Sequence, residues 1–213
     1  HDALPILSHP LRTLYLARNN ISHIALNAFD SLHSLQDLDL SHNSLEKAHS
    51  DWFHSLGRLK QLSLSHNPLA YLPNHAFAGC ASLESLDLSS MPNLHYISVN
   101  TLKGADHLQY LNRAHNPSLL FIHPEASDNL SSLVHLDVSN SGLTALHPAT
   151  FQNLTSLQAL DLHGNPWTCD CEVQGLQEWL LEVLESGLMK HDLVCSRPAH
   201  VKGMSLQHVP MLN

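Results

Sequence analysis

The sequence lacks most of the features that mark an enzyme or a membrane-spanning protein. Its 213 residues contain no apolar run of about 18 residues, the length that a transmembrane helix needs. There is no H-E-x-x-H pair of metal ligands, no glycine-rich phosphate loop and no G-x-S-x-G nucleophile motif. Lysine and arginine number 10 against 19 acidic residues, and the net charge of −9 disfavours nucleic-acid binding. We therefore expect no enzyme activity, no cofactor, no metal site and no nucleic-acid partner.

Aromatic residues are also scarce, at 6% of a chain that is 43% hydrophobic. Leucine supplies most of the apolar mass, and it recurs in L-x-x-L-x-L units spaced 24 or 25 residues apart. The units begin at Leu11, Leu35, Leu59, Leu83, Leu108, Leu133 and Leu157. A fixed period of this length predicts one short strand per unit, with the strands stacked in parallel into an arc.

Two further positions recur in the units. An Asn follows three residues after the last leucine, where its buried side chain can satisfy backbone groups of the turn and form a ladder. The ladder positions hold Asn19, Asn43, Asn67, Asn116 and Asn165. Later in the unit comes a phenylalanine, and we expect these rings to stack as a spine under the convex side. The spine positions hold Phe29, Phe53, Phe77 and Phe151.

The middle of the chain departs from this pattern. Met91 and Ser141 replace ladder asparagines, and Leu102 and Ser127 replace spine phenylalanines. Arg113 stands where an inward leucine belongs. Because an unpaired buried charge is costly, we expect Arg113 to reach a carboxylate or the edge of the solenoid.

Two units also carry one extra residue after the ladder position, in Met91–Leu94 and Asn116–Leu119. We interpret these aligned bulges as a protruding secondary patch for a partner. Its candidate contacts are Met91, Asn93, Asn116 and Ser118. Neutral drift in a tolerant solenoid explains the same irregularity without a function.

The period stops after Trp167, and residues Cys171 to Leu184 have the apolar spacing of an amphipathic helix. Gly187 is placed to end that helix, which would cover the open end of the last repeat. The segments N-P-W-T-C-D-C (165–171), L-Q-E-W-L (176–180) and C-S-R-P (195–198) resemble the cysteine-rich C-terminal cap of extracellular leucine-rich-repeat proteins. The repeats resemble the typical animal subclass of that family, which includes Slit, Toll-type receptors, capricious and tartan.

The resemblance implies an α/β repeat fold: a curved solenoid with parallel strands on its concave face and a disulfide-stapled helical C-terminal cap. In the family the first cap cysteine pairs with the third and the second with the fourth. Carried over, Cys169 pairs with Cys195, and Cys171 pairs with a residue beyond Asn213. We expect about seven repeats over residues 1–166, without the family's N-terminal cap, and an incomplete C-terminal cap over 167–213. We therefore interpret the chain as a piece of a longer protein. Whether a membrane anchor follows it, and what its oligomeric state is, are open questions at this point.

The cysteines allow two other interpretations. Cys169, Cys171, His191 and Cys195 have the composition of a zinc site, but the disulfide cap explains them together with the repeats. Cys80 occupies a slot that holds leucine in other units, so we expect a buried free thiol that acts as a small hydrophobe.

Three N-x-S/T sequons, at Asn20, Asn129 and Asn153, accompany the expected disulfide. Together they predict N-linked glycans and an extracellular protein, either secreted or the ectodomain of a cell-surface protein. Asn129 and Asn153 precede a buried leucine in equivalent positions, so their glycans should leave the concave face bare.

The concave face combines an acidic stripe with a broken column of histidines, and Tyr15 and Tyr110 are potential anchors. An acidic stripe favours a basic partner through electrostatic steering. The candidate ligand contacts are Tyr15, Arg18, Asp39, His42, His66, Asp87, Tyr110, Asn112, His115, His135, Asp137 and Asp161. The alternative is that these are ordinary solvated positions of the family.

The resemblance implies non-catalytic recognition of a protein ligand or co-receptor, mainly through the concave face, in a receptor or adhesion protein. A receptor for a microbial glycan or lipid is a second hypothesis, and an apolar pocket in the irregular middle would favour it. A regulatory or carrier subunit of an extracellular enzyme is a third. The 19 histidines support a further hypothesis, a pH switch, since full protonation would take the net charge from −9 to about +10.

Overall fold

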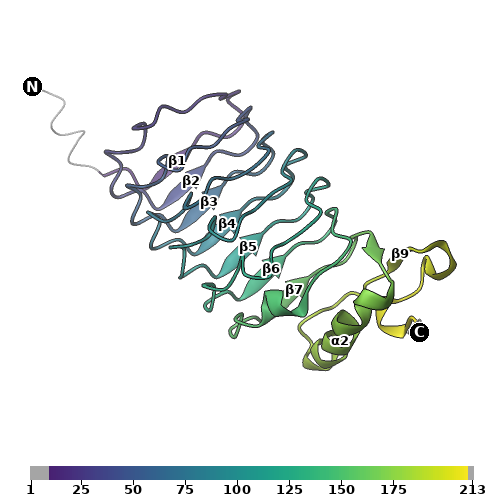
Figure 1. Ribbon diagram of the computed structural model, residues 1–213. Coiled ribbons are helices and arrows are strands. Elements are labelled where there is room, and N and C mark those ends of the chain that lie inside the picture. Colours follow the sequence, from purple (N-terminus) through teal and green to yellow (C-terminus); the bar gives the residue numbers. More distant parts are fainter. Residues whose placement is uncertain (1–9, 211–213) are drawn as a thin grey trace, which may run out of the picture.

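Seven three-residue strands lie side by side in chain order in the computed structural model, which describes residues 10–210 (Figure 1). They are β1 (Thr13–Tyr15), β2 (Asp37–Asp39), β3 (Gln61–Ser63), β4 (Ser85–Asp87), β5 (Tyr110–Asn112), β6 (His135–Asp137) and β7 (Ala159–Asp161). Every neighbouring pair is parallel and in register, which confirms the curved solenoid. Residues 1–9 and 211–213, included in the expected ranges of repeats and cap, lie outside the described residues, and the boundary at 166/167 stays a prediction.

The core lies directly behind this sheet. The middle residue of each strand and the leucine that follows the strand point inward, as Leu38 and Leu40 do with no exposed surface. Each such side chain contributes about 1.5–3 kcal/mol by burial. Because successive repeats place the same leucines in register, one continuous core runs the length of the solenoid.

The asparagine ladder forms as expected. The amide of Asn67 donates to the carbonyls of Leu40 and Leu64, at 3.0 and 2.9 Å, and its oxygen accepts from the backbone N–H of Leu45. Ser141 partly replaces an asparagine, because its hydroxyl donates to the carbonyl of Arg113 at 3.3 Å. The ladder therefore continues through one of its two substituted positions.

The phenylalanine spine is present but divided. Phe53 stacks between Phe29 and Phe77, with ring centroids 6.3 and 6.1 Å apart. Phe151 stacks instead on Trp179 of the cap, at 4.6 Å. The substitutions in the middle repeats separate these two stacks, and the second stack joins the repeats to the cap.

The prediction that Arg113 reaches a carboxylate or the edge of the solenoid is wrong. Its side chain is fully buried and reaches neither a carboxylate nor the edge; Nη2 donates to the hydroxyl of Ser127 at 3.3 Å, and Nε and Nη1 have no partner. Burial lowers the pKa of Arg113 to about 10. Ser127 occupies a spine position, so a small residue there leaves room for the long side chain. Arg113 in a leucine position and Ser127 in a phenylalanine position therefore compensate each other in side-chain volume, but the charge of Arg113 has no counter-charge within the described residues.

The cap follows β7 and closes the solenoid (Figure 1). Its secondary structure comprises β8 (Trp167–Thr168), 3-10 helix η2 (Cys171–Val173), α2 (Gln174–Ser186), β9 (Cys195–Arg197), η3 (Ala199–Val201) and η4 (Leu206–His208), while η1 (Pro148–Phe151) belongs to the last repeat. The expected helix from Cys171 to Leu184 is wrong at its start, because Asp170 caps a 3-10 turn there. Gly187, at φ 75°, ends α2 as expected.

The implied disulfide between Cys169 and Cys195 is confirmed. It closes a separation of 26 residues, which in the chain-entropy picture stabilises the cap by about 3 kcal/mol. The backbone N–H of Leu160 donates to the carbonyl of Leu188 at 2.9 Å, so the cap also pairs with the free edge of β7. Within residues 10–210, no helix is long and apolar enough to cross a membrane.

The ladder predicts that replacing two asparagines in the same repeat position lowers the free energy of unfolding by very different amounts. Asn67→Ala leaves several buried backbone groups unpaired, at roughly 1–3 kcal/mol each, so we expect a loss of about 3 kcal/mol. Asn19 is exposed, and among residues 10–210 its amide donates only to the carbonyl of Ala17. Asn19→Ala should therefore cost under about 1 kcal/mol. Urea unfolding of both variants measures the difference; equal losses would contradict a structural ladder.

The pairing of Arg113 with Ser127 predicts a non-additive mutant cycle. Arg113→Leu alone leaves a void, and Ser127→Phe alone forces a ring against the arginine. The double variant restores the regular repeat and removes an unpaired buried charge, so it should exceed the wild type by roughly 1–4 kcal/mol. Urea unfolding of the four proteins tests this, and strictly additive effects would show that the two side chains are independent.

Candidate functional site

The concave sheet presents two columns of outward side chains, one on each side of the buried strand leucines. The first column comprises Thr13, Asp37, Gln61, Ser85, Tyr110, His135 and Ala159. The second column comprises Tyr15, Asp39, Ser63, Asp87, Asn112, Asp137 and Asp161. The structure thus brings together the expected strand residues on one uncovered face.

This face is acidic without internal compensation. Its seven strands carry five aspartates and neither a lysine nor an arginine. The one imidazole on the seven strands is that of His135, whose Nε2 lies 3.0 Å from Asp161 Oδ2. Carboxylates in one shallow surface add their fields, so the face attracts cationic groups.

Several of these polar side chains also hold the backbone. Oδ1 of Asp39, Asp87 and Asp137 accepts the N–H of the residue two positions later, at 2.9–3.0 Å, and Asn112 does the same. Such turns favour Asp and Asn on local grounds, which supports the interpretation of these residues as ordinary family positions. Because only one oxygen is used, each aspartate still has Oδ2 to offer to a ligand.

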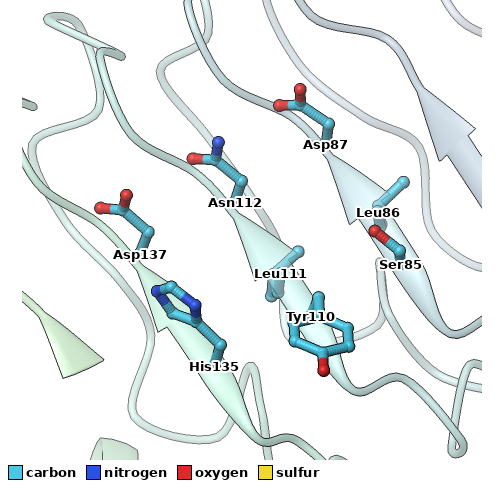
Figure 2. Close-up of a pocket in the computed structure, with 8 residues that line it drawn as sticks. All are labelled: Ser85, Leu86, Asp87, Tyr110, Leu111, Asn112, His135 and Asp137. Carbon is cyan, nitrogen blue, oxygen red and sulfur yellow. The ribbon is translucent and has the colours of Figure 1, made fainter. Parts of the chain in front are cut away.

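Two adjoining hollows of about 260 Å³ each lie on the concave face. The first hollow lies over β1–β4, between Tyr15 and Asp87. The second hollow lies over β4–β6, and Figure 2 shows Asp87, Asn112 and Asp137 in one row, with Tyr110 and His135 in the row beside it. Each hollow therefore combines carboxylates with a tyrosine.

The family profile described as leucine rich repeat matches residues 9–69, 34–94 and 106–166, which is more than half of the chain. The chain belongs to the leucine-rich repeat family.

Leucine-rich repeat-containing protein 52 of Mus musculus is 32% identical over 98 residues, 45% of this chain and 30% of that protein. Leucine-rich repeat transmembrane protein FLRT2 of Rattus norvegicus is 46% identical over 83 residues, 39% of this chain and 12% of that protein. The crystal structure of a TLR13–ssRNA13 complex superposes with a TM-score of 0.73 at 26% identity, covering 92% of this chain and 27% of that chain. The chain therefore spans less than a third of each of these proteins.

The histidine column of this leucine-rich repeat chain lies at the rim of the concave face and has a backbone role. Its positions have φ between 53° and 73°, the left-handed region that favours Gly and Asn. They are Arg18, His42, His66, Ser90, His115, Asn140 and Gly164. The turn before the ladder asparagine requires this conformation, so candidate contacts Arg18, His42, His66 and His115 are turn residues whose side chains border the face.

The prediction of a secondary patch was wrong for two of its four residues. Met91 and Asn116 have no exposed surface, because both fill ladder positions inside the repeat. The extra residues of the longer repeats push Asn93 and Ser118 outward instead. Ser118 donates its hydroxyl to the carbonyl of Pro92 at 2.7 Å, so the two bulges support each other.

The three predicted glycosylation sites lie outside the concave strands. Asn20 and Asn153 are exposed. Asn129 is half-buried, and its amide nitrogen donates to the carbonyl of Leu102 and to Asp106 Oδ1, at 2.9 and 2.7 Å. Glycan attachment stays a prediction at all three sites, and at Asn129 it would replace one of these hydrogen bonds.

The cysteines and the other candidate zinc ligands do not form a metal-binding cluster in the described part of the chain. Cys80 is fully buried, as expected, and burial raises its pKa to about 12. The Cys169–Cys195 disulfide removes two of the four ligands of the alternative zinc site. Among residues 10–210 no group of three His, Cys, Asp or Glu could hold a metal ion. Cys171 is exposed and unpaired within the same range, and the implied pairing of this cysteine stays a prediction.

Sequence reasoning missed a hollow of about 660 Å³ away from the concave strands. It lies among the connections of the first three repeats, where Glu46, Lys47, Trp52 and Tyr71 contribute to its lining. An apolar pocket in the irregular middle would have favoured a glycan or lipid ligand, whereas this hollow is near the start of the described residues. An aromatic residue in the equivalent position of the next two repeats, Tyr96 and Phe121, was the available signal.

The rim predicts a pH-dependent stability. The rings of His42 and His66 stack with centroids 3.9 Å apart. Desolvation, followed by the charges of His66 and Arg18, lowers the pKa of His42 below its usual 6.5, although Asp39 opposes this. The unfolded chain therefore binds this proton more readily than the folded chain. The contribution of His42 to stability is complete above about pH 6.5 and is lost as the pH falls through its lowered folded pKa.

His42→Asn suits the left-handed backbone and should reduce the loss of unfolding free energy between pH 7.5 and 5.5. His107→Asn, at an exposed histidine outside the stack, is the control. Urea unfolding at both pH values measures the effect. A His42→Asn protein with the pH dependence of the wild type would show that the stack does not matter.

Proposed function

We propose that this chain is a non-catalytic recognition module of an extracellular protein, and that it binds a protein partner through its concave sheet. The observation that carries the proposal is the uncovered seven-stranded face, with two in-register columns of outward side chains. The leucines behind the sheet are buried between successive repeats and against the cap, and the concave strands present a broad regular surface to the solvent. A surface of short rigid strands holds contact residues in place and so lowers the ordering cost of binding.

The acidic character of the face supports a partner with a basic surface. Five aspartates without a lysine or arginine on the strands would steer such a partner and raise its association rate. The same charge opposes a nucleic acid, although the superposed TLR13 structure is a complex with ssRNA. Tyr15 and Tyr110 are exposed and offer contact area at low entropic cost.

The cap supports an extracellular setting. A disulfide persists in oxidising compartments, and three sequons fit the same secretory route. FLRT2 is described as a transmembrane protein, which is consistent with the ectodomain of a cell-surface protein. We propose either that setting or a secreted protein.

Recognition of a glycan or lipid is a second candidate, and the hollow beside Trp52 and Tyr71 favours it. That hollow is larger than either concave hollow and combines an aromatic wall with Glu46 and Lys47. It lies away from the concave strands, so the two candidates predict different mutational footprints. A regulatory or carrier subunit of an extracellular enzyme remains the third proposal and would use the same concave face.

A charge-removal variant tests the concave face. Asp39→Asn, Asp87→Asn and Asp137→Asn combined keep the Oδ1 hydrogen bonds and remove three charges. An array of secreted and cell-surface ectodomains identifies partners of the wild type, and surface plasmon resonance compares the variants. We expect the triple variant to bind about tenfold more weakly, mainly through slower association.

A matched control removes the same charge elsewhere. Asp51→Asn, Asp128→Asn and Glu182→Gln combined alter exposed residues outside the concave strands. We expect this control to bind like the wild type. If the control loses affinity and the concave variant does not, the partner binds another surface.

A further inference from the structure

The two concave hollows form one continuous surface, because Ser85 and Asp87 line both of them. We propose that this surface binds an extended segment of the partner protein that runs across the strands and places a lysine or arginine side chain in each hollow. The inference rests on the protein-binding function proposed above and adds the chemistry and spacing of the partner residues.

Charge complementarity is the first argument. Asp39 belongs to the first hollow, Asp137 to the second, and Asp87 to both. Each uses Oδ1 for a backbone N–H, which fixes the carboxylate on the sheet surface while Oδ2 can accept from a ligand. A guanidinium or ammonium group donates the charge-assisted hydrogen bonds that such an oxygen accepts.

The tyrosines are the second argument, since each hollow has one. Tyr15 and Tyr110 are 67% and 50% exposed, so their rings are not covered by other parts of the chain. Asp37 Oδ2 accepts the Tyr15 hydroxyl at 3.3 Å, which positions that ring beside the first hollow. The charge of Asp37 and desolvation also raise the pKa of Tyr15, so its hydroxyl stays a donor. An aromatic face beside a carboxylate attracts a cation more strongly than either group does alone.

The register of the sheet gives the spacing. Tyr15 lies on β1 and Tyr110 on β5, four strand steps apart. At about 4.8 Å per step, the two tyrosines are about 19 Å apart across the sheet. They are also offset by two residues, about 7 Å, along the strand direction, because Tyr15 ends its strand and Tyr110 begins its own, so their separation is about 20 Å. An extended chain advances about 3.3 Å per residue, so this distance corresponds to about six residues. Residues six apart point to the same side of an extended segment, because side chains alternate between its two faces.

The solenoid provides its own control surface. Tyr96 and Phe121 are 55% and 58% exposed, similar to the concave tyrosines, but they lie on the connections of their repeats. Neither lines a concave hollow or the larger hollow beside Trp52. Substituting them removes an exposed aromatic residue without touching the proposed contacts.

The test uses dye-labelled threonine- and serine-rich peptides and the full 213-residue chain. One peptide carries two arginines six residues apart, a second has the same composition with adjacent arginines, and a third carries glutamates in place of the arginines. Fluorescence anisotropy measures affinity for the wild type, Tyr15→Ser, Tyr110→Ser, Tyr96→Ser and Phe121→Ser. Thermal melting confirms that the variants fold.

We expect the six-residue spacing to bind about fivefold more tightly than adjacent arginines, and the glutamate peptide not to bind. Tyr15→Ser and Tyr110→Ser should each weaken the spaced peptide roughly three- to fivefold and abolish the preference for spacing. The two control variants should bind like the wild type. Equal affinity for both arginine peptides, or concave tyrosine variants that match the wild type, overturns the inference.

Three further outcomes are decisive. If spermine competes with the spaced peptide at equal affinity and with the same dependence on Tyr15 and Tyr110, the hollows are a small-polyamine site and the inference fails. If the peptides show no preference while the triple aspartate variant still loses its ectodomain partner, the proposed function holds and this inference alone is overturned. If partner binding ignores the aspartates, the proposed function itself is wrong.

Discussion

Buried asparagine side chains that tie the backbone of one repeat to the next are the constraint on which this molecule depends. The amide of Asn43 donates to the carbonyls of Leu16 and Leu40, in two successive repeats, and its oxygen accepts the N–H of Ile21. A single repeat cannot bury its leucines alone, so each is stable only against a neighbour in the same register. The ladder secures that register at the turns where a buried asparagine follows the strand, at Asn43, Asn67, Asn116 and Asn165. The surface columns and both concave hollows follow from it.

The same turns explain why the concave face has the residues it has. The positions before the ladder require a left-handed backbone, and the aspartates at the strand ends accept the N–H groups of the turns. A residue such as Asp87 therefore serves the fold with one oxygen and faces the solvent with the other. The structural role and the proposed binding role use different oxygens of the same side chain, so neither interpretation of the acidic stripe excludes the other.

The repeat pattern was sufficient to predict the strands, their register, the ladder and the residues on the concave face. Each of these depends on local spacing, and seven copies of one pattern reinforce each other. The Cys169–Cys195 disulfide followed from the resemblance to the family cap. The prediction for the Arg113 side chain was wrong because its position depends on Ser127, which lies in another part of the repeat. No periodic pattern indicates that contact. The prediction that Met91 and Asn116 are exposed contacts was wrong because the inserted residue bulges after the ladder position. The ladder residue itself stays buried.

Arg113 also has a mechanical consequence. A solenoid pulled from its two ends carries the same force through every repeat, and it extends first where stacking between repeats is weakest. The repeat with Arg113 interrupts the leucine column, and Ser127 interrupts the aromatic spine behind it. This joint lies directly after β5, under the second hollow and away from the first. Tension on the chain would therefore change the curvature beneath Tyr110 while Tyr15 kept its surroundings, and the distance between the two tyrosines would report the load.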